Sequence, residues 1–250
     1  MKRVLLVAAS VVLAASVAQA ALIWDNGPFI THPNGGVGGK HASLIQTPGT
    51  IYGWNINHAL APNNFRIADD FTVKGPEDQL TEMLWYGYQT GAGGVPTFTG
   101  AYIRIWDGPP GGGGNLLYGD GTTNRIANAP GAFEPNFYGP TGIYRVSAVP
   151  GDANRAVMEI KINMAWVPAL TVGKTYWVDV GLTGSLASGP WANPVVPHPP
   201  GANSRQHNSG VWTALLDGTY AADMPFKMYA VPEPASLGLL LLGAALLRRR

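Results

Sequence analysis

Residues 174–182 of this 250-residue chain read KTYWVDVGL, and they show the alternation that decides the fold. Apolar side chains stand at every second position, namely Tyr176, Val178, Val180 and Leu182. Because successive side chains of a strand point to opposite faces, this spacing predicts a strand with one apolar row against a core. We therefore expect strands to build the interior.

The same alternation recurs along the chain. Residues 158–164 read MEIKINM, with apolar side chains at the even positions and polar ones at the odd positions. Residues 101–108 read AYIRIWDG, where two isoleucines share one face and Tyr102, Arg104 and Trp106 share the other. Further candidate strands read FRIADDFTV, LTEMLWYGYQT, GIYRVSAV, VWTALL and PFKMYAV. The 33 glycines and 21 prolines disfavour long helices.

About ten such strands with polar outer faces predict an all-β domain. We expect an antiparallel two-sheet sandwich, jelly-roll or immunoglobulin-like, and a single closed barrel is the second possibility. Segments 107–115 and 193–210 are rich in glycine and proline, and we expect them to be surface loops. No internal repeat divides residues 21–231, so we expect them to form one domain.

The first 20 residues have the order of a secretory signal peptide. A basic start precedes an apolar stretch over 4–17, which Ala18 and Ala20 follow. A basic start, a short apolar core and an A-x-A site together mark a segment that signal peptidase removes. We expect an N-terminal signal helix, cleavage after Ala20 and export by the secretion machinery. A buried hydrophobic helix is the alternative.

The chain closes with the apolar run 235–247 and three arginines. As a helix, these 13 apolar residues rise about 20 Å, against a hydrocarbon core of about 30 Å. The arginines reduce this mismatch by snorkelling to the headgroups, and they favour the cytoplasmic side. Residues 232–250 therefore predict a short hydrophobic helix that anchors the exported protein weakly and transiently in the inner membrane.

The tail begins with Pro232-Glu233-Pro234 and continues with the Leu/Gly/Ala-rich run and the terminal arginines, and in this it resembles the PEP-CTERM sorting signal of Gram-negative bacteria. The resemblance implies processing by an exosortase, a membrane-embedded cysteine transpeptidase-like enzyme, and association with exopolysaccharide and the cell surface. A plain tail anchor and a eukaryotic lipid-anchor signal are the alternatives, although the latter normally lacks a closing basic stop. The sorting residues are Pro232, Glu233, Pro234, Arg248, Arg249 and Arg250.

Three segments of the middle region resemble parts of secreted bacterial β-sandwich proteins that often carry sorting tails. They are IADDF (67–71), RIWDGPPGGGG (104–114) and GSLASGPWANP (184–194). This second resemblance implies the sandwich fold and brings no assigned activity.

Charge and cysteine content exclude several classes of protein. Five of the 16 basic residues and one of the 15 acidic residues lie in the two flanking segments, which leaves 11 basic and 14 acidic residues in 21–231. The resulting net charge of −3 argues against nucleic-acid binding, which requires a basic surface. The chain has no cysteine, so disulfides and thiolate zinc sites are excluded.

The sequence shows no local catalytic motif. The five histidines have no H-E-x-x-H spacing, and neither a G-x-S-x-G elbow nor a P-loop is present. We therefore expect no enzymatic activity. A carboxylate pair on different strands is the alternative, because glycoside hydrolysis needs two carboxyl groups and no local motif. The unranked candidates are Asp69, Asp70, Asp107, Glu159 and Asp179.

Adjacent carboxylates offer the hard oxygen ligands that calcium takes. The candidate ligands of a structural Ca²⁺ are Asp69, Asp70 and Asp107, although their spacing matches no EF-hand loop. The favoured alternative for ADDF is a strand in which Asp70 bonds a turn amide and Phe71 packs inward. We expect no cofactor other than this possible ion.

The eight tryptophans raise the possibility of sugar binding, because an exposed aromatic ring stacks on the apolar face of a pyranose. Most tryptophans bury their large area in a core. Trp106, beside a glycine-rich loop, and Trp191, in a Gly/Pro-rich loop, are the first candidates for ligand contact. Two or three tryptophans gathered on one exposed face would favour binding.

Together these features predict an exported, non-enzymatic cell-surface or extracellular-matrix protein that an exosortase sorts and that contacts exopolysaccharide. The alternative is a secreted glycan-active hydrolase with a carboxylate pair.

Overall fold

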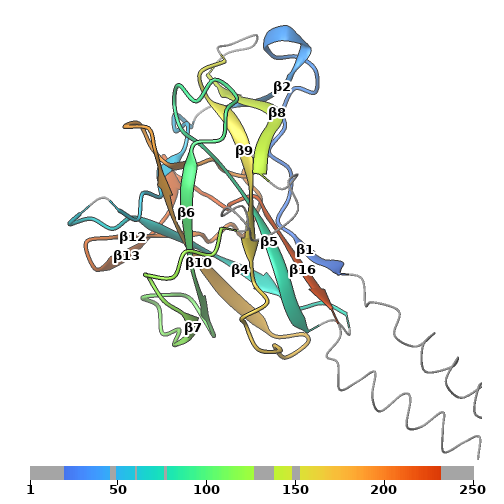
Figure 1. Cartoon of the computed structure of the whole chain (residues 1–250), viewed down its shortest axis with the longest axis vertical. Coiled ribbons are helices and arrows are strands. Elements are labelled where there is room, and N and C mark those ends of the chain that lie inside the picture. Colours follow the sequence, from blue (N-terminus) through green and yellow to red (C-terminus); the bar gives the residue numbers. More distant parts are fainter. Residues whose placement is uncertain are drawn as a thin grey trace, which may run out of the picture.

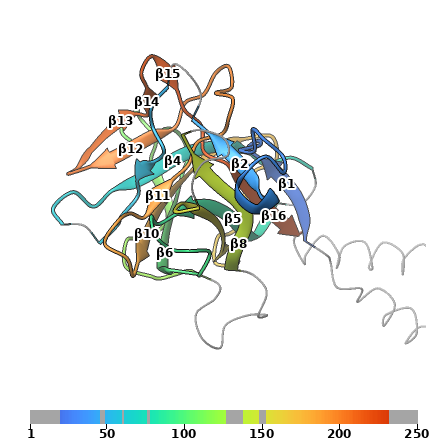
Figure 2. The ribbon, with the colours of Figure 1, turned by 90° about the horizontal axis from the view of Figure 1, so that it is seen from above.

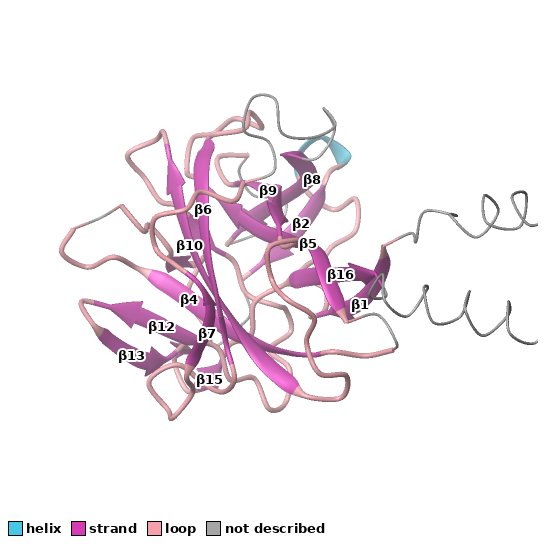
Figure 3. Cartoon of the chain, turned by 60° about the horizontal axis from the view of Figure 1, so that its bottom comes forward, coloured by secondary structure: helices cyan, strands magenta, loops and turns pink. Residues whose placement is uncertain are grey.

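The computed structural model describes residues 20–45, 49–59, 61–75, 78–126, 138–147 and 153–231. Within them the chain is built of strands and loops, with one short helical turn, η1 (Val37–Gly39) (Figure 3). No helix in this part of the chain is long and apolar enough to cross a membrane. The predicted terminal helices, Ala18 and the sorting residues lie outside the described residues. Ala20 is exposed and directly precedes the first strand.

Two large sheets contain most of the strands (Figure 1). The eight-stranded sheet runs β1 (Ala21–Asp25), β16 (Phe226–Val231), β5 (Gln79–Tyr88), β9 (Ala156–Asn163), β8 (Tyr138–Val146) and β2 (His41–Leu44), with β11 (Trp191–Ala192) and β3 (Trp54–Asn55) attached beside β5. The six-stranded sheet runs β13 (Val211–Ala214), β12 (Arg205–Asn208), β4 (Arg66–Thr72), β10 (Thr175–Gly184), β6 (Phe98–Trp106) and β7 (Leu116–Gly119). A small hairpin pairs β14 (Leu216–Asp217) with β15 (Tyr220–Ala221).

The long strands alternate between the two sheets. Strands β4, β6 and β10 belong to the six-stranded sheet, whereas β5, β9 and β16 belong to the eight-stranded sheet. The chain therefore crosses repeatedly from one layer to the other, and the view from above separates the layers (Figure 2). The prediction of an all-β domain is confirmed, and the arrangement is consistent with a two-sheet sandwich.

One apolar cluster joins the inner faces of both sheets. The eight-stranded sheet contributes Trp85 and Phe226, whose rings stack at 5.9 Å, and the six-stranded sheet contributes Val178 and Ile103. All four residues of the predicted row on β10 are buried in this cluster. The alternating rows of β6 and β9 are confirmed as well, because their apolar members are fully buried.

Three local expectations were wrong. The sheets are not wholly antiparallel, because β2 pairs with β8 in parallel. Segment 193–210 is more than a surface loop, since it contains β12 and buries Asn193 and Ser204. The predicted strand VWTALL is divided between β13 and β14, which belong to different sheets. Segment 107–115 is a loop, as expected.

A buried arginine fastens the parallel pair to its neighbours. Arg145 of β8 is 1% exposed, and its guanidinium donates to the carbonyl oxygens of Leu44, Ile51 and Tyr52 at 2.8 Å. Burial lowers the pKa of Arg145 to about 10. These acceptors are neutral backbone carbonyls, so Arg145 connects β8 to β2 and to the segment of Ile51 and Tyr52.

Candidate functional site

The outer face of the six-stranded sheet gathers aromatic and charged side chains. Alternation turns Ile67, Ile103 and Val178 inward and their neighbours outward. We call the outward set the arginine–tryptophan face. It comprises Arg66, Tyr102, Arg104, Trp106, Trp177, Asp179, Arg205, His207 and Trp212, together with His58 from the loop before β4.

The strand register places charged residues in one row across the sheet. On β10, Asp179 lies opposite Ala68 of β4 on one side and Arg104 of β6 on the other. Arg205 of β12 lies opposite the same Ala68. The row therefore reads Arg205, Ala68, Asp179 and Arg104 over four neighbouring strands, with a carboxylate between two arginines.

Asp179 is the buried centre of this row. The Nε of Arg66 donates to both carboxylate oxygens of Asp179 at 3.1 Å, and Nη1 of Arg104 lies 3.6 Å from Oδ2. Asp179 is fully buried, and the side chains of both arginines are mostly buried. Removing three charges from water is unfavourable unless they pair, so this ion cluster fixes the positions of the two guanidinium groups.

Three tryptophans lie on the same face. Trp106 of β6 and Trp212 of β13 start four strands apart, yet their rings meet edge to face at 6.4 Å. The glycine-rich loop after β6 also meets Trp212, since a Cβ at Gly111 would lie 2.6 Å from the Cβ of Trp212. Arg66 lies over Trp212, with 5.3 Å between Cζ and the ring centroid. Trp177, register partner of Trp106, is almost fully buried.

Two histidines border the cluster. His58 packs on Gly181 of β10, where a Cβ would lie 3.0 Å from the imidazole, and its Nε2 bonds the carbonyl of Gly121 at 2.7 Å. That carbonyl only accepts, so Nε2 carries the proton. Burial lowers the pKa of His58, and the charges of Arg104 and Arg66 lower it further. The pKa of His207 is lowered by burial and by Arg66. Both rings therefore favour the neutral form.

Several donors of this face have no acceptor. In the described part of the chain, Nη1 of Arg104, Nε1 of Trp106 and Nε of Arg205 are buried atoms without a hydrogen bond. A buried donor without an acceptor costs about 1–3 kcal/mol. Within the same described residues, the face also holds one buried acceptor without a hydrogen bond, Nδ1 of His58, and Nη1 of Arg104 lies within ion-pair distance of Asp179.

A second candidate lies on the outer face of the eight-stranded sheet, as a pocket of about 470 Å³. Phe29, Ile143 and Tyr86 form its apolar wall, and the rings of Phe29 and Tyr86 are 4.7 Å apart. Two carboxylates, Asp25 and Glu159, line the same pocket.

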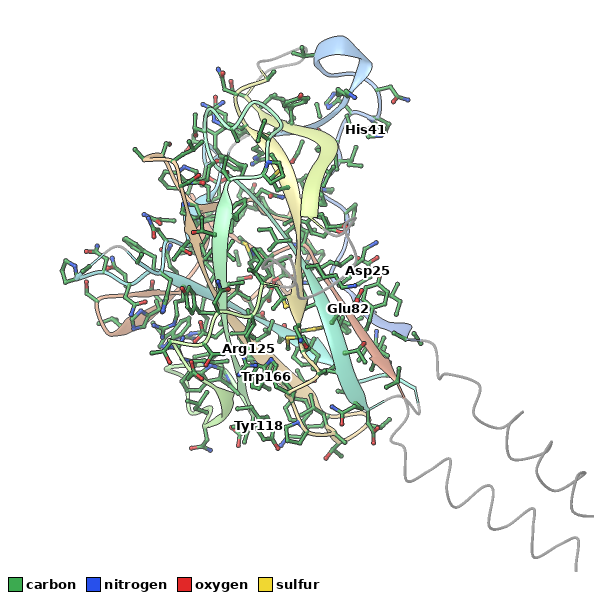
Figure 4. All side chains as sticks on the ribbon, in the orientation of Figure 1. Asp25, His41, Glu82, Tyr118, Arg125 and Trp166 are labelled. Atoms are coloured by element: carbon green, nitrogen blue, oxygen red, sulfur yellow. The ribbon has the colours of Figure 1, made fainter. Side chains whose placement is uncertain are left out.

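Both carboxylates of this pocket have partners. The carboxylate of Asp25 of β1 (Figure 4) lies 3.5 Å from Nζ of Lys227. The hydroxyl of Tyr86 donates to Oε2 of Glu159 at 2.9 Å. The pKa of Tyr86 is raised by burial and by the charge of Glu159, so its hydroxyl remains a donor.

The predicted calcium ligands do not converge. Asp69 faces the core, where Oδ2 accepts from the amide of Met224 at 2.7 Å and from Nδ2 of Asn26 at 2.9 Å. Asp70 lies on the opposite face of β4, and Asp107 accepts from the amide of Asn115 at 2.6 Å. Among the residues that the structure describes, no cluster of three or more His, Asp or Glu residues suits a metal ion.

The favoured interpretation of ADDF was half right. Phe71 packs inward, as expected, and is fully buried. The carboxylate that bonds backbone amides is that of Asp69, whose Oδ1 accepts from the amide of Asp70 at 2.9 Å. The pKa of Asp69 is raised by burial and then by the charge of Asp223.

The five carboxylate candidates are distributed over the molecule. Asp179 belongs to the arginine–tryptophan face and Glu159 to the pocket on the other sheet. The two candidate tryptophans are also separated. Trp106 meets Trp212, whereas Trp191 begins β11 beside Tyr88 in the eight-stranded sheet. Sequence alternation indicated that Arg104 and Trp106 face outward, but it missed Arg66, Trp212 and Asp25 as members of the two sites.

A separate aromatic–arginine pair lies beside β7 (Figure 4). Arg125 covers Trp166, with 3.7 Å between Cζ and the ring centroid, and Nε1 of Trp166 donates to the carbonyl of Asn163. Nε1 of Trp166 therefore has a hydrogen-bond acceptor, whereas Nε1 of Trp106 on the arginine–tryptophan face has none among the described residues.

No protein-family model, no curated protein and no solved structure matches this chain significantly. The functional assignment therefore rests on the geometry of the two sites and on the sequence.

Proposed function

We propose that the protein is an exported, non-enzymatic surface or matrix protein that binds carbohydrate through its arginine–tryptophan face. The observation that carries the proposal is the meeting of two partly exposed rings, Trp106 and Trp212, 6.4 Å apart, with Arg66 over the ring of Trp212. Aromatic rings stack on the C–H face of a sugar, while N–H groups bond its oxygens. A sandwich presents such a face as a rigid platform.

The proposed location depends on the two flanking segments. Residues 1–20 direct export, and residues 232–250 anchor the protein until an exosortase-type enzyme processes the tail. Strands β1 and β16 support this arrangement, because Ala21 and Ala230 are register partners. The first and last strands of the described domain therefore place its two ends side by side.

Glycan binding is tested on the full chain with a polysaccharide panel. We expect Trp106→Ala and Trp212→Ala each to weaken binding at least about tenfold, the range of a lost stacking contact. Trp24→Ala is the matched control, because Trp24 is also half-buried and lies under a cation, Lys74, but on the other sheet. Unchanged binding in both face variants, or an equal loss in the control, would contradict the proposal.

Sorting is tested by intact mass and cell fractionation. We expect the native protein to lose its tail, and a variant with Pro232, Glu233 and Pro234 replaced by alanine to keep it and stay in the membrane fraction. A native protein that keeps residues 232–250 in its mature form would refute exosortase processing.

A secreted glycan hydrolase is the second candidate, and the pocket on the eight-stranded sheet is what favours it. Asp25 and Glu159 line one cavity, and glycoside hydrolysis needs two carboxyl groups in one site. Release of reducing sugar that Glu159→Gln abolishes would establish the hydrolase and overturn the non-enzymatic assignment. Activity that survives in both Glu159→Gln and Asp25→Asn would exclude this pair.

A further inference from the structure

We infer that the end of the domain at which β16 finishes docks on the phospholipid headgroups of the membrane in which the tail is anchored. We call this surface the tail-proximal end, and it comprises the exposed residues Leu22, Lys74, Val172 and Lys174. The inference rests on the proposed anchoring by residues 232–250 and adds a contact of the domain itself. It is independent of carbohydrate binding by the arginine–tryptophan face.

The connection between the domain and the apolar run of the tail is short. Val231 is the last residue of β16, and a single Pro-Glu-Pro tripeptide separates it from the run 235–247. The Cα atoms of residues 231 and 235 are therefore at most about 14 Å apart, while the headgroup layer on each side of a bilayer is roughly 6 Å thick. Once the run is inserted, Val231 lies within the headgroups or close above them.

Backbone pairing connects the end of β16 to a turn on the neighbouring sheet. Val231 lies opposite Gln79 at the start of β5. The carbonyl of Asp78, the residue before Gln79, accepts from the amide of Leu170 at 3.0 Å. Leu170 leads directly into the exposed turn 171–174, so this turn lies at the same end of the molecule as Val231.

The turn exposes an apolar and a cationic side chain. The amide of Lys174 closes it by donating to the carbonyl of Thr171 at 3.2 Å, and Gly173 supplies a positive φ of 80°. Val172, between Thr171 and Gly173, is 47% exposed. The turn therefore offers one aliphatic group and one ammonium group to whatever the end of the domain meets.

The end of β4 and the start of β1 complete the tail-proximal end. The amide of Val73 donates to the carbonyl of Lys174 at 3.2 Å, so Lys74 follows directly beside the turn. Nζ of Lys74 lies 4.5 Å from the ring centroid of Trp24 in β1, and Leu22 of the same strand is 49% exposed. Two lysines and two exposed apolar side chains thus surround the end of β16.

This combination suits the interfacial layer of a bilayer. A lysine buries its aliphatic stem while its ammonium group stays at the level of the phosphates, and exposed apolar side chains gain by leaving water. The sequence also places two acidic residues near this end, Glu77 and Asp78, so an excess of positive charge is not the basis of the contact. Its basis is the short connection, which holds the two lysines at high effective concentration near the phosphates.

The test uses the full chain in vesicles of phosphatidylethanolamine and phosphatidylglycerol that carry a quencher on the headgroups. The chain has no cysteine, so Val172→Cys gives a single site for a fluorescent label. Val95→Cys is the matched control. Val95 is also an exposed valine of a turn, but it follows β5, whose ten residues place it about 30 Å from Gln79, at the opposite end of the molecule (Figure 1).

The two labels should respond differently. We expect the label at position 172 to lose at least about half of its fluorescence, because it lies at the level of the headgroup layer. The label at position 95 should keep its fluorescence, because the length of the domain separates it from the quencher.

A lysine variant tests the polar part of the contact. In the labelled Val172→Cys chain, Lys174→Glu should raise the ratio of unquenched to quenched label at least about fivefold, since one lysine near an anionic lipid surface contributes about that factor. Lys40→Glu is the control, because Lys40 is equally exposed but follows η1, far from the tail-proximal end (Figure 1). Thermal unfolding midpoints equal to that of the native chain check that both variants are folded.

The outcomes separate docking from anchoring. A chain that does not float with the vesicles overturns the membrane anchor and the inference together. A chain that floats with both labels bright, or with both quenched equally, overturns docking and leaves the anchor intact. An equal effect of Lys174→Glu and Lys40→Glu also overturns docking through the tail-proximal end.

Discussion

Asp69 and Asp179 lie on neighbouring strands of one sheet, β4 and β10, and both are fully buried. They face opposite sides. Asp69 points into the core and accepts from the neutral N–H groups of Met224 and Asn26. Asp179 points outward and is held by the charged guanidinium groups of Arg66 and Arg104.

The difference separates two uses of a buried carboxylate. Asp69 joins β4 to the loop after β1 and the loop before β16, so it ties distant parts of the chain together. Its raised pKa shows that burial and the charge of Asp223 act against the ionised form. Asp179 instead orients two mostly buried arginines on the outward side of the sheet, so it determines where charge lies on that side.

The largest expected effect comes from Asp179→Ala. Removing the carboxylate leaves the largely buried guanidinium groups of Arg66 and Arg104 without a counter-charge. We expect the free energy of unfolding, measured in urea, to fall by about 3–5 kcal/mol. The double variant Asp179→Leu with Arg66→Met also removes one of the two arginine charges, so its free energy of unfolding should fall less. If the free energy of unfolding of the single variant fell by less than about 1 kcal/mol, the ion cluster would not stabilise the fold.

Asp69→Asn should have an intermediate effect. The carboxylate accepts N–H groups on both oxygens, from Asp70 on Oδ1 and from Met224 on Oδ2. An amide presents one oxygen and one NH₂ group, so one backbone donor loses its acceptor. We expect a loss of about 1–3 kcal/mol in the same urea experiment. A loss of stability as large as that of Asp179→Ala would show that neutral and charged partners stabilise these two carboxylates equally.

The pH dependence of stability tests the raised pKa of Asp69. Between the ordinary carboxyl pKa and the raised one, the folded chain holds a proton that the unfolded chain has released. The free energy of unfolding should therefore decrease as pH rises through this window, by at most about 1.4 kcal/mol per pH unit for one proton. Asp69→Asn should make this slope smaller in urea unfolding series from about pH 4 to about pH 7, and a part of it should remain because burial also raises the pKa of Asp223. The lowered pKa values of His58 and His207 give the opposite slope in both chains, so an identical pH dependence of the native chain and Asp69→Asn would contradict the assignment.

The smallest effect on stability is expected at Trp212. Trp212→Leu removes the ring beneath Arg66 but leaves the ion pair with Asp179 in place. We expect thermal unfolding to report a loss of about 0.5–1 kcal/mol, while glycan binding falls about tenfold. If stability and binding fell in proportion, the ring would act as packing and not as ligand contact.

Sequence alternation was sufficient for the strands with apolar rows, and it placed Arg104 and Trp106 outward. The same alternation also predicts that Asp69 points into the core, because Asp69 stands between Ile67 and Phe71 in the inward row of β4. Strand β12 was missed for a physical reason. Its inward residue, Gln206, donates to the carbonyl of Asn55 instead of packing in the core, so no apolar alternation marks it.

The site itself could not be assembled from sequence. Arg66, Arg104 and Asp179 lie far apart in the chain, and only the register of β10 with β4 and β6 joins them. Trp212 reaches the cluster through β12, the strand that the sequence did not reveal.

The pairing of the first and last strands determines how the domain responds to force. Ala21 and Ala230 are opposite each other, so stretching the chain by both ends would unzip the β1–β16 ladder one bond pair at a time. A domain tethered only at its C-terminal end experiences drag differently. Its load enters through β16, which is bonded along both edges, to β1 and to β5. Such a tether pulls on the interior of a sheet, where two ladders share the tension.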